Sequence, residues 1–329
     1  MCYSAMAEQN AKKLARMLGA TVDIESYRDL FQRRLDGEKL YINKAMEIPF
    51  LNEATSMPEK GVGKVIREWQ DAELERLSEA KAVQETRLAN ATASLKKKET
   101  KKALEDVRIA TSKISKFELD LSRIKEPRLK SESQQRIYPL HFVSMLALDE
   151  SGNKVIRPFR YLLRPHNEDE SFDFKRSGCY NARLDSLGTV PFWRDCVGKR
   201  HGVMVIKKFY ENVPTVEYLK KNKLSATEKA KENIVVCFEP ADGEYLFIPT
   251  LWDVWKKRGE SPLYSAAAIT DEPFPEVARA GHQRTPIPLL ESAVDSWLES
   301  TAPLKELREN ILSQRASPTF GYRVLGEVA

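Results

Sequence analysis

The sequence predicts an α+β protein with a mixed β-sheet core, peripheral helices and one inserted helical hairpin. Two observations indicate this class. From residue 137 onward, short apolar runs alternate with turn signals such as Asp149–Asn153, which is typical of a sheet of short strands. Between Lys64 and Glu126 the chain has neither Gly nor Pro and is rich in good helix formers. We therefore expect a discontinuous sheet domain, residues 1–63 and 131–329, with a helical insertion at 64–130.

The N-terminal part is expected to contain two helices followed by irregular structure and short strands. Apolar residues at near-helical spacing predict a first helix between Ser4, a suitable N-cap, and Gly19, a suitable C-cap. Residues 21–35 predict a second short helix.

The insertion is expected to fold as an antiparallel helical hairpin, a coiled coil. As one helix it would extend roughly 95 Å, whereas a turn between Asn90 and Lys102 lets two arms bury their apolar stripes against each other. The whole formal excess of +5 in the chain lies between Lys64 and Lys130. The lysine-rich stretch 96–102 at the tip is either a contact for nucleic acid or a protein partner, or a solvated helix end. The stripe residues are Ile66, Trp69, Leu74, Leu77 and Val83 in the first arm, and Leu104, Val107, Thr111, Ile114, Phe117, Leu121 and Ile124 in the second.

Six strands are expected in the C-terminal part, and a helix and a last strand follow them. The strand candidates are residues 138–148, 155–163, 201–211, 233–240, 243–252 and 261–270. The helix is expected at 288–300 and the last strand at 322–325. Many short strands with few long helices favour a predominantly β, mixed-sheet core.

Composition excludes several classes of protein. There is no apolar run of about 18 residues and no secretory signal pattern at the N-terminus, so we expect no membrane contact and a cytoplasmic location in a bacterial or phage-like host. The four cysteines are far apart and form no CxxC pair. We therefore expect no zinc site, no disulfide framework, and no cofactor or metal.

Cys2, directly after the initiator methionine, is the first candidate for chemistry. If Met1 is removed, Cys2 carries an α-amine with a reference pKa of about 7.7–8.0 next to a thiol at about 8.5. An amine and a thiol so placed can close a five-membered ring on an aldehyde. The alternative is that Cys2 is an ordinary residue of a frayed terminus.

Three further stretches carry polar groups that a purely structural chain does not require. Asn181 and Arg183 stand two apart and would share one side of an extended segment. Glu211 ends an apolar strand, and His282 follows a glycine. Each has a structural alternative as a cap, an ion-pair partner or a loop residue. Together with Cys2 they supply a nucleophile, an amide, a carboxylate and an imidazole, which is a full acid–base inventory.

These residues occur in motifs that resemble one family. Met1–Cys2, Asn181–Arg183 (Asn-Ala-Arg), Phe209–Glu211 (Phe-Tyr-Glu), Leu251–Trp252 and His282–Pro286 (His-Gln-Arg-Thr-Pro) appear in the order found in the SOS response-associated peptidase (SRAP) family. The resemblance covers residues 1 to about 60 and 137–329 and does not include the helical insertion. It implies the family's mixed-sheet pseudo-barrel. The departures from the family pattern are Tyr3, Ser4, Tyr161, Lys207, Lys208, Asn212 and Thr285.

The resemblance implies a function and a role for each residue. Family members shield abasic sites in single-stranded DNA by a thiazolidine crosslink from Cys2, after autoproteolytic removal of Met1. Glu211 would assist ring opening, His282 would shuttle protons, and Asn181 would orient the new N-terminus. The positions expected to contact DNA are Arg160, Tyr161, Arg183, Lys207, Phe209 and Arg284, with Tyr161 or Phe209 offering a face for base stacking.

Three other readings remain open from the sequence. The chain could be a silent single-stranded DNA-binding module that grips DNA through Arg160, Arg183 and Lys207. It could be a scaffold in which the hairpin self-associates or binds a protein partner. It could also be a thiol hydrolase on unrelated substrates, with Cys2, His282 and Asn181 as a Cys-His-Asn set.

Overall fold

The computed structural model describes residues 4–129, 131–224 and 232–325, and within them twelve strands form one mixed sheet. Its centre is a closed ring of five strands in which β7 pairs with β9, β9 with β10, β10 with β5, β5 with β4, and β4 again with β7. Only the β10–β5 pairing in this ring is parallel. The ring strands are β4 (Phe142–Leu148), β5 (Lys154–Tyr161), β7 (His201–Pro214), β9 (Leu246–Trp255) and β10 (Leu263–Asp271).

Strand β7 is long enough to belong to the barrel and to extend beyond it. Its first half pairs with β4 and β9, and its second half pairs with β1 on one edge and β8 on the other. All six strands expected from the sequence are confirmed, as is the last strand, β12. The strands outside the ring are β1 (Ser4–Ala7), β2 (Thr21–Val22), β3 (Arg136–Ile137), β6 (Asn181–Arg183), β8 (Asn233–Pro240), β11 (Thr285–Pro286) and β12 (Phe320–Leu325).

Two apolar cores lie on the two faces of the barrel strands. Alternate residues of one strand point to opposite faces, so Val143 and Met145 join one cluster while Phe142 and Leu146 join the other. The first cluster is drawn from all five ring strands and fills the barrel. The second packs against the helices that cover the sheet.

The shorter helices surround the barrel. The structure confirms the expected helix at 21–35 as α2, and the expected C-terminal helix as the 3-10 turn η3 (Glu291–Ala293) followed by α10. Among the described residues, no helix combines the length and apolarity needed to cross a membrane. The helices are α1 (Ala11–Leu18), α2 (Ile24–Leu35), α3 (Lys44–Asn52), α6 (Phe172–Lys175), α7 (Pro191–Cys196), α8 (Thr215–Asn222), α9 (Pro275–Arg279), α10 (Val294–Glu299) and α11 (Leu304–Ser313), and the other 3-10 turns are η1 (Glu132–Gln134) and η2 (Leu184–Ser186).

The first expected helix is wrong at its N-terminal end. Ser4–Ala7 form strand β1, and α1 begins only at Ala11, where the side chain of Asn10 accepts a hydrogen bond from the Lys13 amide. The predicted C-cap is confirmed, because Gly19 adopts the left-handed conformation at φ 61°. Pairing of β1 with both β3 and β7 outweighs the local helical spacing.

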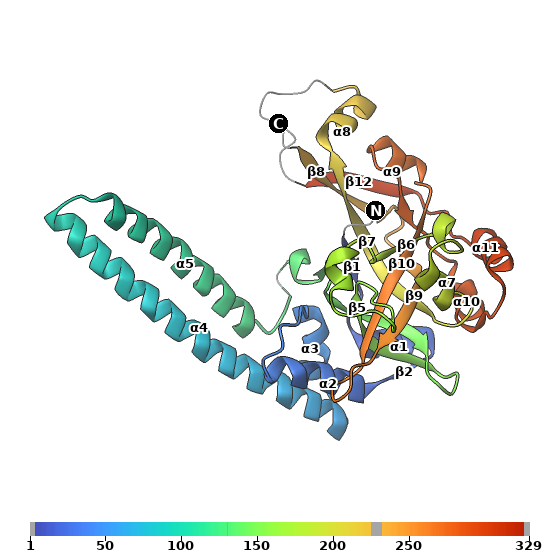
Figure 1. The fold of residues 1–329 in the computed structure, drawn as a ribbon, viewed down its shortest axis with the longest axis horizontal. Helices are drawn as coiled ribbons and strands as arrows, with labels where there is room; N and C mark the ends of the chain where they lie inside the picture. The colour runs from blue at the N-terminus through green and yellow to red at the C-terminus, as the bar shows by residue number, and fades with distance from the viewer. Residues whose placement is uncertain (1–3, 130, 225–231, 326–329) are drawn as a thin grey trace.

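The hairpin consists of α4 (Met57–Lys97) and α5 (Lys101–Lys125), so its turn lies where the sequence predicts it. Figure 1 shows the two helices projecting from the body as an arm, with α2 and α3 near its base. Helix α4 begins earlier than expected, at a capping box formed by Ser56 and Glu59. Gly63 lies inside it, and a Cβ there would come within 2.5 Å of the Phe50 carbonyl oxygen, so glycine permits this close contact with α3.

The seam between the two arms differs from the predicted stripe. Leu77 is buried there as expected, but the other fully buried positions are alanines, Ala91, Ala103 and Ala110. Leu104 and Val83, which the stripe placed inside, are 48% and 63% exposed. Small side chains let the helices approach closely, which turns the neighbouring larger residues outward.

Candidate active site

A carboxylate and an imidazole meet beside the second half of β7. Glu211 is fully buried and pairs in register with Val236 of β8. His282 Nε2 lies 3.4 Å from Glu211 Oε2. The structure therefore brings together the two groups that the sequence nominated for acid–base chemistry.

Gly281 explains how His282 reaches this position. Its φ of +92° is in the left-handed region, which glycine adopts without strain. A Cβ at residue 281 would lie 3.1 Å from Val213 Cγ1 and 3.2 Å from the backbone of Glu217 and Tyr218. The turn after α9 can therefore rest directly on β7 and α8 only because residue 281 has no side chain.

The hydrogen bonding of the His282 ring fixes its neutral tautomer. Nδ1 lies 2.8 Å from the Arg284 carbonyl oxygen, which can only accept, so Nδ1 carries the hydrogen. The Arg284 amide is farther from Nδ1, at 3.4 Å. In the neutral ring Nε2 then carries no hydrogen and lies 3.4 Å from Glu211 Oε2. Burial lowers the pKa of His282 to about 4, so the ring is neutral near pH 7.

Asn181 lies on β6, next to the barrel. It is buried, its strand runs parallel to β10 with Asn181 opposite Ala268, and the Tyr161 hydroxyl donates to its side-chain oxygen at 3.4 Å. At the end of the same strand pairing, Thr270 stands between Arg183 of β6 and Pro286 of β11. This register connects the strand of Asn181 to the segment that follows His282.

Arg183 and Arg284 meet at one carboxylate. Both guanidinium groups bond Asp185 Oδ2, Arg284 at 2.6 Å and Arg183 at 3.0 Å, and they hold the pKa of Asp185 below its usual range. Sequence reasoning missed Asp185, although its position two residues after Arg183 was a usable signal. A cavity of about 800 Å³ adjoins this cluster and is lined by Asn181, Arg183, Lys175 and Arg176, among others.

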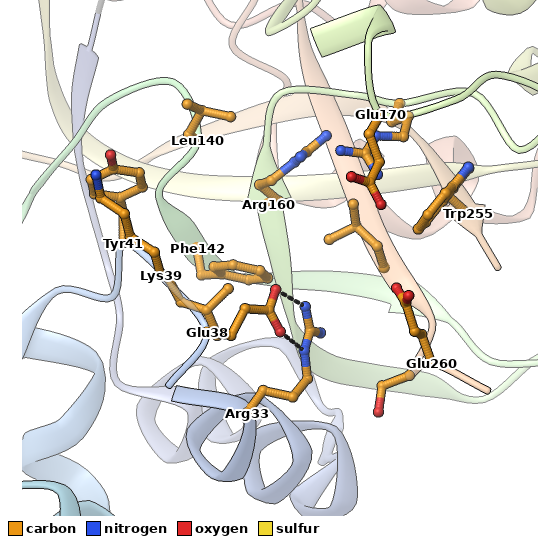
Figure 2. Close-up of a pocket in the computed structure, with 14 residues that line it drawn as sticks. Arg33, Glu38, Lys39, Tyr41, Leu140, Phe142, Arg160, Glu170, Trp255 and Glu260 are labelled. Atoms are coloured by element: carbon orange, nitrogen blue, oxygen red, sulfur yellow. Dashed lines mark hydrogen bonds and ion pairs between the residues drawn. The ribbon is translucent and has the colours of Figure 1, made fainter. Parts of the chain in front are cut away.

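Arg160 is not part of this cluster. It is buried, donates to the Leu162 carbonyl oxygen and forms an ion pair with Asp173 at 2.6 Å. It lines a different cavity of about 470 Å³, shown in Figure 2, next to the bidentate Arg33–Glu38 pair. Its guanidinium is engaged by partners inside the protein, and its expected contact with a phosphate stays a prediction.

The two rings expected to offer a stacking face are buried in this structure. Tyr161 and Phe209 are each only 1% exposed. Phe209 stacks on Phe238 with ring centroids 5.1 Å apart. A buried ring presents no face to an incoming base, so neither residue can act as a stacking platform in this conformation. Lys207 is exposed, with Nζ 5.3 Å from the centre of the Tyr245 ring.

Cys2 lies outside the described residues, which begin at Ser4. Ser4 stands opposite Tyr210, the residue before Glu211. Arg136 Nε donates to Ser4 Oγ at 2.7 Å, and the Arg136 guanidinium also lies 3.8 Å from the centre of the Tyr210 ring. Sequence reasoning missed Arg136, because no local pattern connects it to Ser4.

The fold is an α+β fold with a closed mixed barrel, and a buried carboxylate–imidazole pair lies next to its first described strand. These features define a class of protein whose candidate active site lies beside the N-terminal strand. The chain belongs to the SOS response associated peptidase (SRAP) family, whose model matches residues 90–328. This membership indicates a role in the DNA-damage response with DNA as the binding partner. The match begins within α4, so it does not include the N-terminal Met1–Cys2 motif.

Solved structures with a similar chain course exist. They include a protein from Bordetella bronchiseptica (18% identity, TM-score 0.46, covering 59% of this chain and 88% of that one) and a protein from Bacteroides thetaiotaomicron (14%, 0.45, 58% and 78%). A phage-related protein from Bordetella bronchiseptica is similar to the same extent (15%, 0.41, 59% and 82%). No curated protein matches the chain.

Proposed function

We propose that this protein binds single-stranded DNA and captures abasic sites as a thiazolidine between Cys2 and the ring-opened deoxyribose. The observation that carries the proposal is the contact between Glu211 and His282, one register position from the first described residue of β1. Family membership supplies the class of partner.

Chain connectivity supports the participation of Cys2. Two peptide units separate it from Ser4, so the Cα atoms of the two residues are at most about 7.6 Å apart. Ser4 is fully buried next to Tyr210, and Glu211 follows Tyr210 along β7. This short tether supports the proposal that the amine and thiol of Cys2 act together with Glu211 and His282.

The proposed reaction is a condensation that loses one water. The Cys2 amine forms a bond to the aldehyde carbon, and the carbonyl oxygen leaves as water to give an imine. The thiol sulfur then adds to the same carbon while its proton passes to the nitrogen, closing the ring. Holding both nucleophiles at one carbon supplies effective molarity, and no oxidant or reductant is needed.

Glu211 and His282 would move the protons of this sequence. The Nε2 lone pair of a neutral His282 can accept the proton that the attacking group releases, and the adjacent carboxylate can receive or return it. The same pair is suited to activating water for release of Met1, which we propose as a single self-processing event. Arg183 and Arg284 are the cations placed to meet phosphates, once they exchange Asp185 for the DNA backbone.

The decisive test is incubation with abasic and intact oligonucleotides, read on a denaturing gel. Wild-type protein is expected to form a heat-stable adduct with abasic DNA only. Cys2→Ala should abolish the adduct, and His282→Gln should slow it at least tenfold, while both variants still bind intact single strands. An adduct that survives in Cys2→Ala would exclude the thiazolidine.

A matched cysteine control separates the N-terminal thiol from thiols in general. Cys196 is fully buried, and burial raises its pKa to about 12, so Cys196→Ala should leave adduct formation unchanged. If wild-type protein binds single-stranded DNA equally with and without an abasic site and forms no adduct, the protein is the silent binding module instead.

A further inference from the structure

We propose that the tip of the α4–α5 hairpin is a second nucleic-acid contact, which binds phosphates of the strand that extends away from the barrel. The hairpin tip is defined here as residues 96–102. The inference rests on the proposed function in taking DNA as the ligand, and it adds a separate surface to it.

The tip concentrates unpaired positive charge. Lys96, Lys97, Lys98, Lys101 and Lys102 are all exposed, and within the described chain none of them forms an ion pair. The rest of the hairpin is different, because its arms carry many paired cations, as in Lys81–Glu118 at 3.0 Å and Arg76–Glu73 at 2.6 Å. Glu99 is the only acid among the seven tip residues.

Helix stability explains only some of these lysines. Lys96 and Lys97 lie in the last turn of α4, where the helix dipole favours cations. Lys101 and Lys102 lie in the first turn of α5, where cations are unfavourable and where this chain places no acid. Helices α2 and α4 have Glu25 and Glu59 in their first turns. Helix α1 also has two lysines and no acid in its first turn, but there both lysines are paired with a carboxylate. A bound phosphate would interact favourably with the positive end of the α5 dipole and with Lys101 and Lys102.

The neighbouring surface has the other groups that contact a phosphate backbone. A cavity of about 550 Å³ between the two arms, next to the tip, is lined by Thr86, Asn90, Ser94, Thr100 and Lys102, among others. Lysine and amide side chains are usual donors to phosphate oxygens. The Thr86 and Ser94 hydroxyls donate to helix carbonyl oxygens, and the acid in this lining, Asp106, is paired with Arg87.

The length of the arm sets the size of DNA that can reach both sites. Gln70 is held to the body by its hydrogen bond to Glu47 at 3.0 Å. From Gln70 to Lys97 a helix extends about 40 Å at 1.5 Å per residue, and Figure 1 shows the connection between α4 and α5 at the far end of the arm. The arm alone corresponds to about 12 nucleotides at about 3.4 Å per stacked nucleotide, so a strand that reaches both sites must be longer than this. Short oligonucleotides should therefore occupy one site, and longer ones both.

The test compares intact single strands of about 10 and about 40 nucleotides by fluorescence anisotropy at several salt concentrations. In the variant K96Q/K97Q/K98Q/K101Q/K102Q, affinity for the long strand should fall at least tenfold, while affinity for the short strand stays within about twofold. The slope of log affinity against log salt for the long strand should flatten by up to about 3.5, at about 0.7 per phosphate contact. Equal affinity of variant and wild type for both lengths would overturn the inference.

A charge-matched pair of variants controls for net charge and folding. Lys113 and Lys116 are exposed in the middle of α5, so K113Q/K116Q should leave long-strand affinity within about twofold, whereas K97Q/K98Q should weaken it more. Circular dichroism should show equal helicity in both. Equal losses from the two variants would mean that only the net charge matters, which would contradict a tip site. Competition by polyglutamate that does not depend on DNA length would contradict it as well.

Failure of this inference is distinguishable from failure of the proposed function. All the affinities above are measured on intact DNA and need no crosslink. With an abasic strand of about 10 nucleotides, the five-lysine variant should form the adduct at the wild-type rate. If wild-type protein forms no adduct with this strand, the result counts against the proposed chemistry of Cys2. If the affinity for intact DNA does not depend on strand length, the result counts against the tip site.

Discussion

In the barrel body, strands from distant parts of the chain close a ring, whereas the hairpin is folded from one continuous stretch. The ring joins β4, β5, β7, β9 and β10 and fills its interior with side chains from all five. The hairpin seam is narrow and rests on a few alanines and on ion pairs such as Lys81–Glu118. Surface ion pairs contribute little, about 0–1 kcal/mol each.

This difference shows where each kind of function can be placed. Long-range closure fixes Glu211 and His282 to within hydrogen-bonding reach, which acid–base chemistry requires. A hairpin held by local contacts positions its tip only coarsely, which is sufficient for contact with a phosphate backbone. The two regions meet in the first turns of α4, where Val62, Val65 and Ile66 pack into the body's core.

The largest effect is expected from one substitution at that boundary. Ile66 is fully buried, so Ile66→Ala should lower the free energy of unfolding by about 2–5 kcal/mol. Val83 lies farther along the same helix and is 63% exposed, so Val83→Ala should change it by less than about 0.5 kcal/mol. Urea unfolding followed by tryptophan fluorescence measures both. Similar costs at the two sites would show that α4 is stabilised uniformly.

Acid should destabilise the body before it affects the hairpin. His201 accepts a hydrogen bond from the Gly198 amide at Nε2 and donates from Nδ1 to the Trp297 carbonyl oxygen, so it must stay neutral. Burial lowers its pKa from about 6.5 to about 4. The unfolded chain therefore binds more protons in this window, and stability falls as pH drops from about 6.5 toward 4, by about 3 kcal/mol from this group at pH 4.

Chemical denaturation at pH 7 and pH 4.5 checks this expectation, with His201→Gln as the control that removes the histidine's share of the pH dependence. The hairpin contains no histidine, so its helical signal should survive where near-ultraviolet dichroism of the body is lost. Parallel loss of both signals would mean that the hairpin depends on the body for its structure.

A smaller effect is expected from the contact that holds the start of β1. Arg136→Ala removes the hydrogen bond to Ser4 Oγ and should slow adduct formation about tenfold, with unchanged affinity for intact DNA, because only the placement of the N-terminal segment is altered. Single-turnover kinetics with abasic DNA measure this. Ser4→Ala should slow the reaction as well, and the double variant should be no slower than Arg136→Ala alone. Additive losses would show that Arg136 acts independently of Ser4, and a lower affinity for intact DNA would place Arg136 in DNA binding instead.

Much of the local structure was predictable from the sequence. The apolar runs between residues 138 and 270 became strands, and the hairpin turn fell between Lys97 and Lys101, because these features depend on neighbouring residues. Ser4–Ala7 was misread as helix because its partners, Ile137 and Phe209, are far away in the chain. The start of α4 was misplaced because Gly61 and Gly63 normally weaken helices, whereas packing against α3 favours Gly63 here.

For the candidate site, the sequence nominated residues but not contacts. Glu211, His282, Asn181, Arg183 and Arg284 were identified by type and order. Their mutual arrangement depends on β7 passing β1 and on the turn at Gly281, neither of which has a local signature. The burial of Arg160, Tyr161 and Phe209 was not foreseen for the same reason, since it is decided by the closed barrel. The roles of all these residues in catalysis and DNA binding remain predictions.

The position of β1 between β7 and β3 has a consequence for biosynthesis. Ser4–Ala7 is translated before the hairpin, whereas both of its partner strands are translated after it. The ring itself cannot close before β10 has emerged. Contacts between residues so far apart in the chain form slowly, so β1 becomes anchored only after the hairpin and β7 have been made.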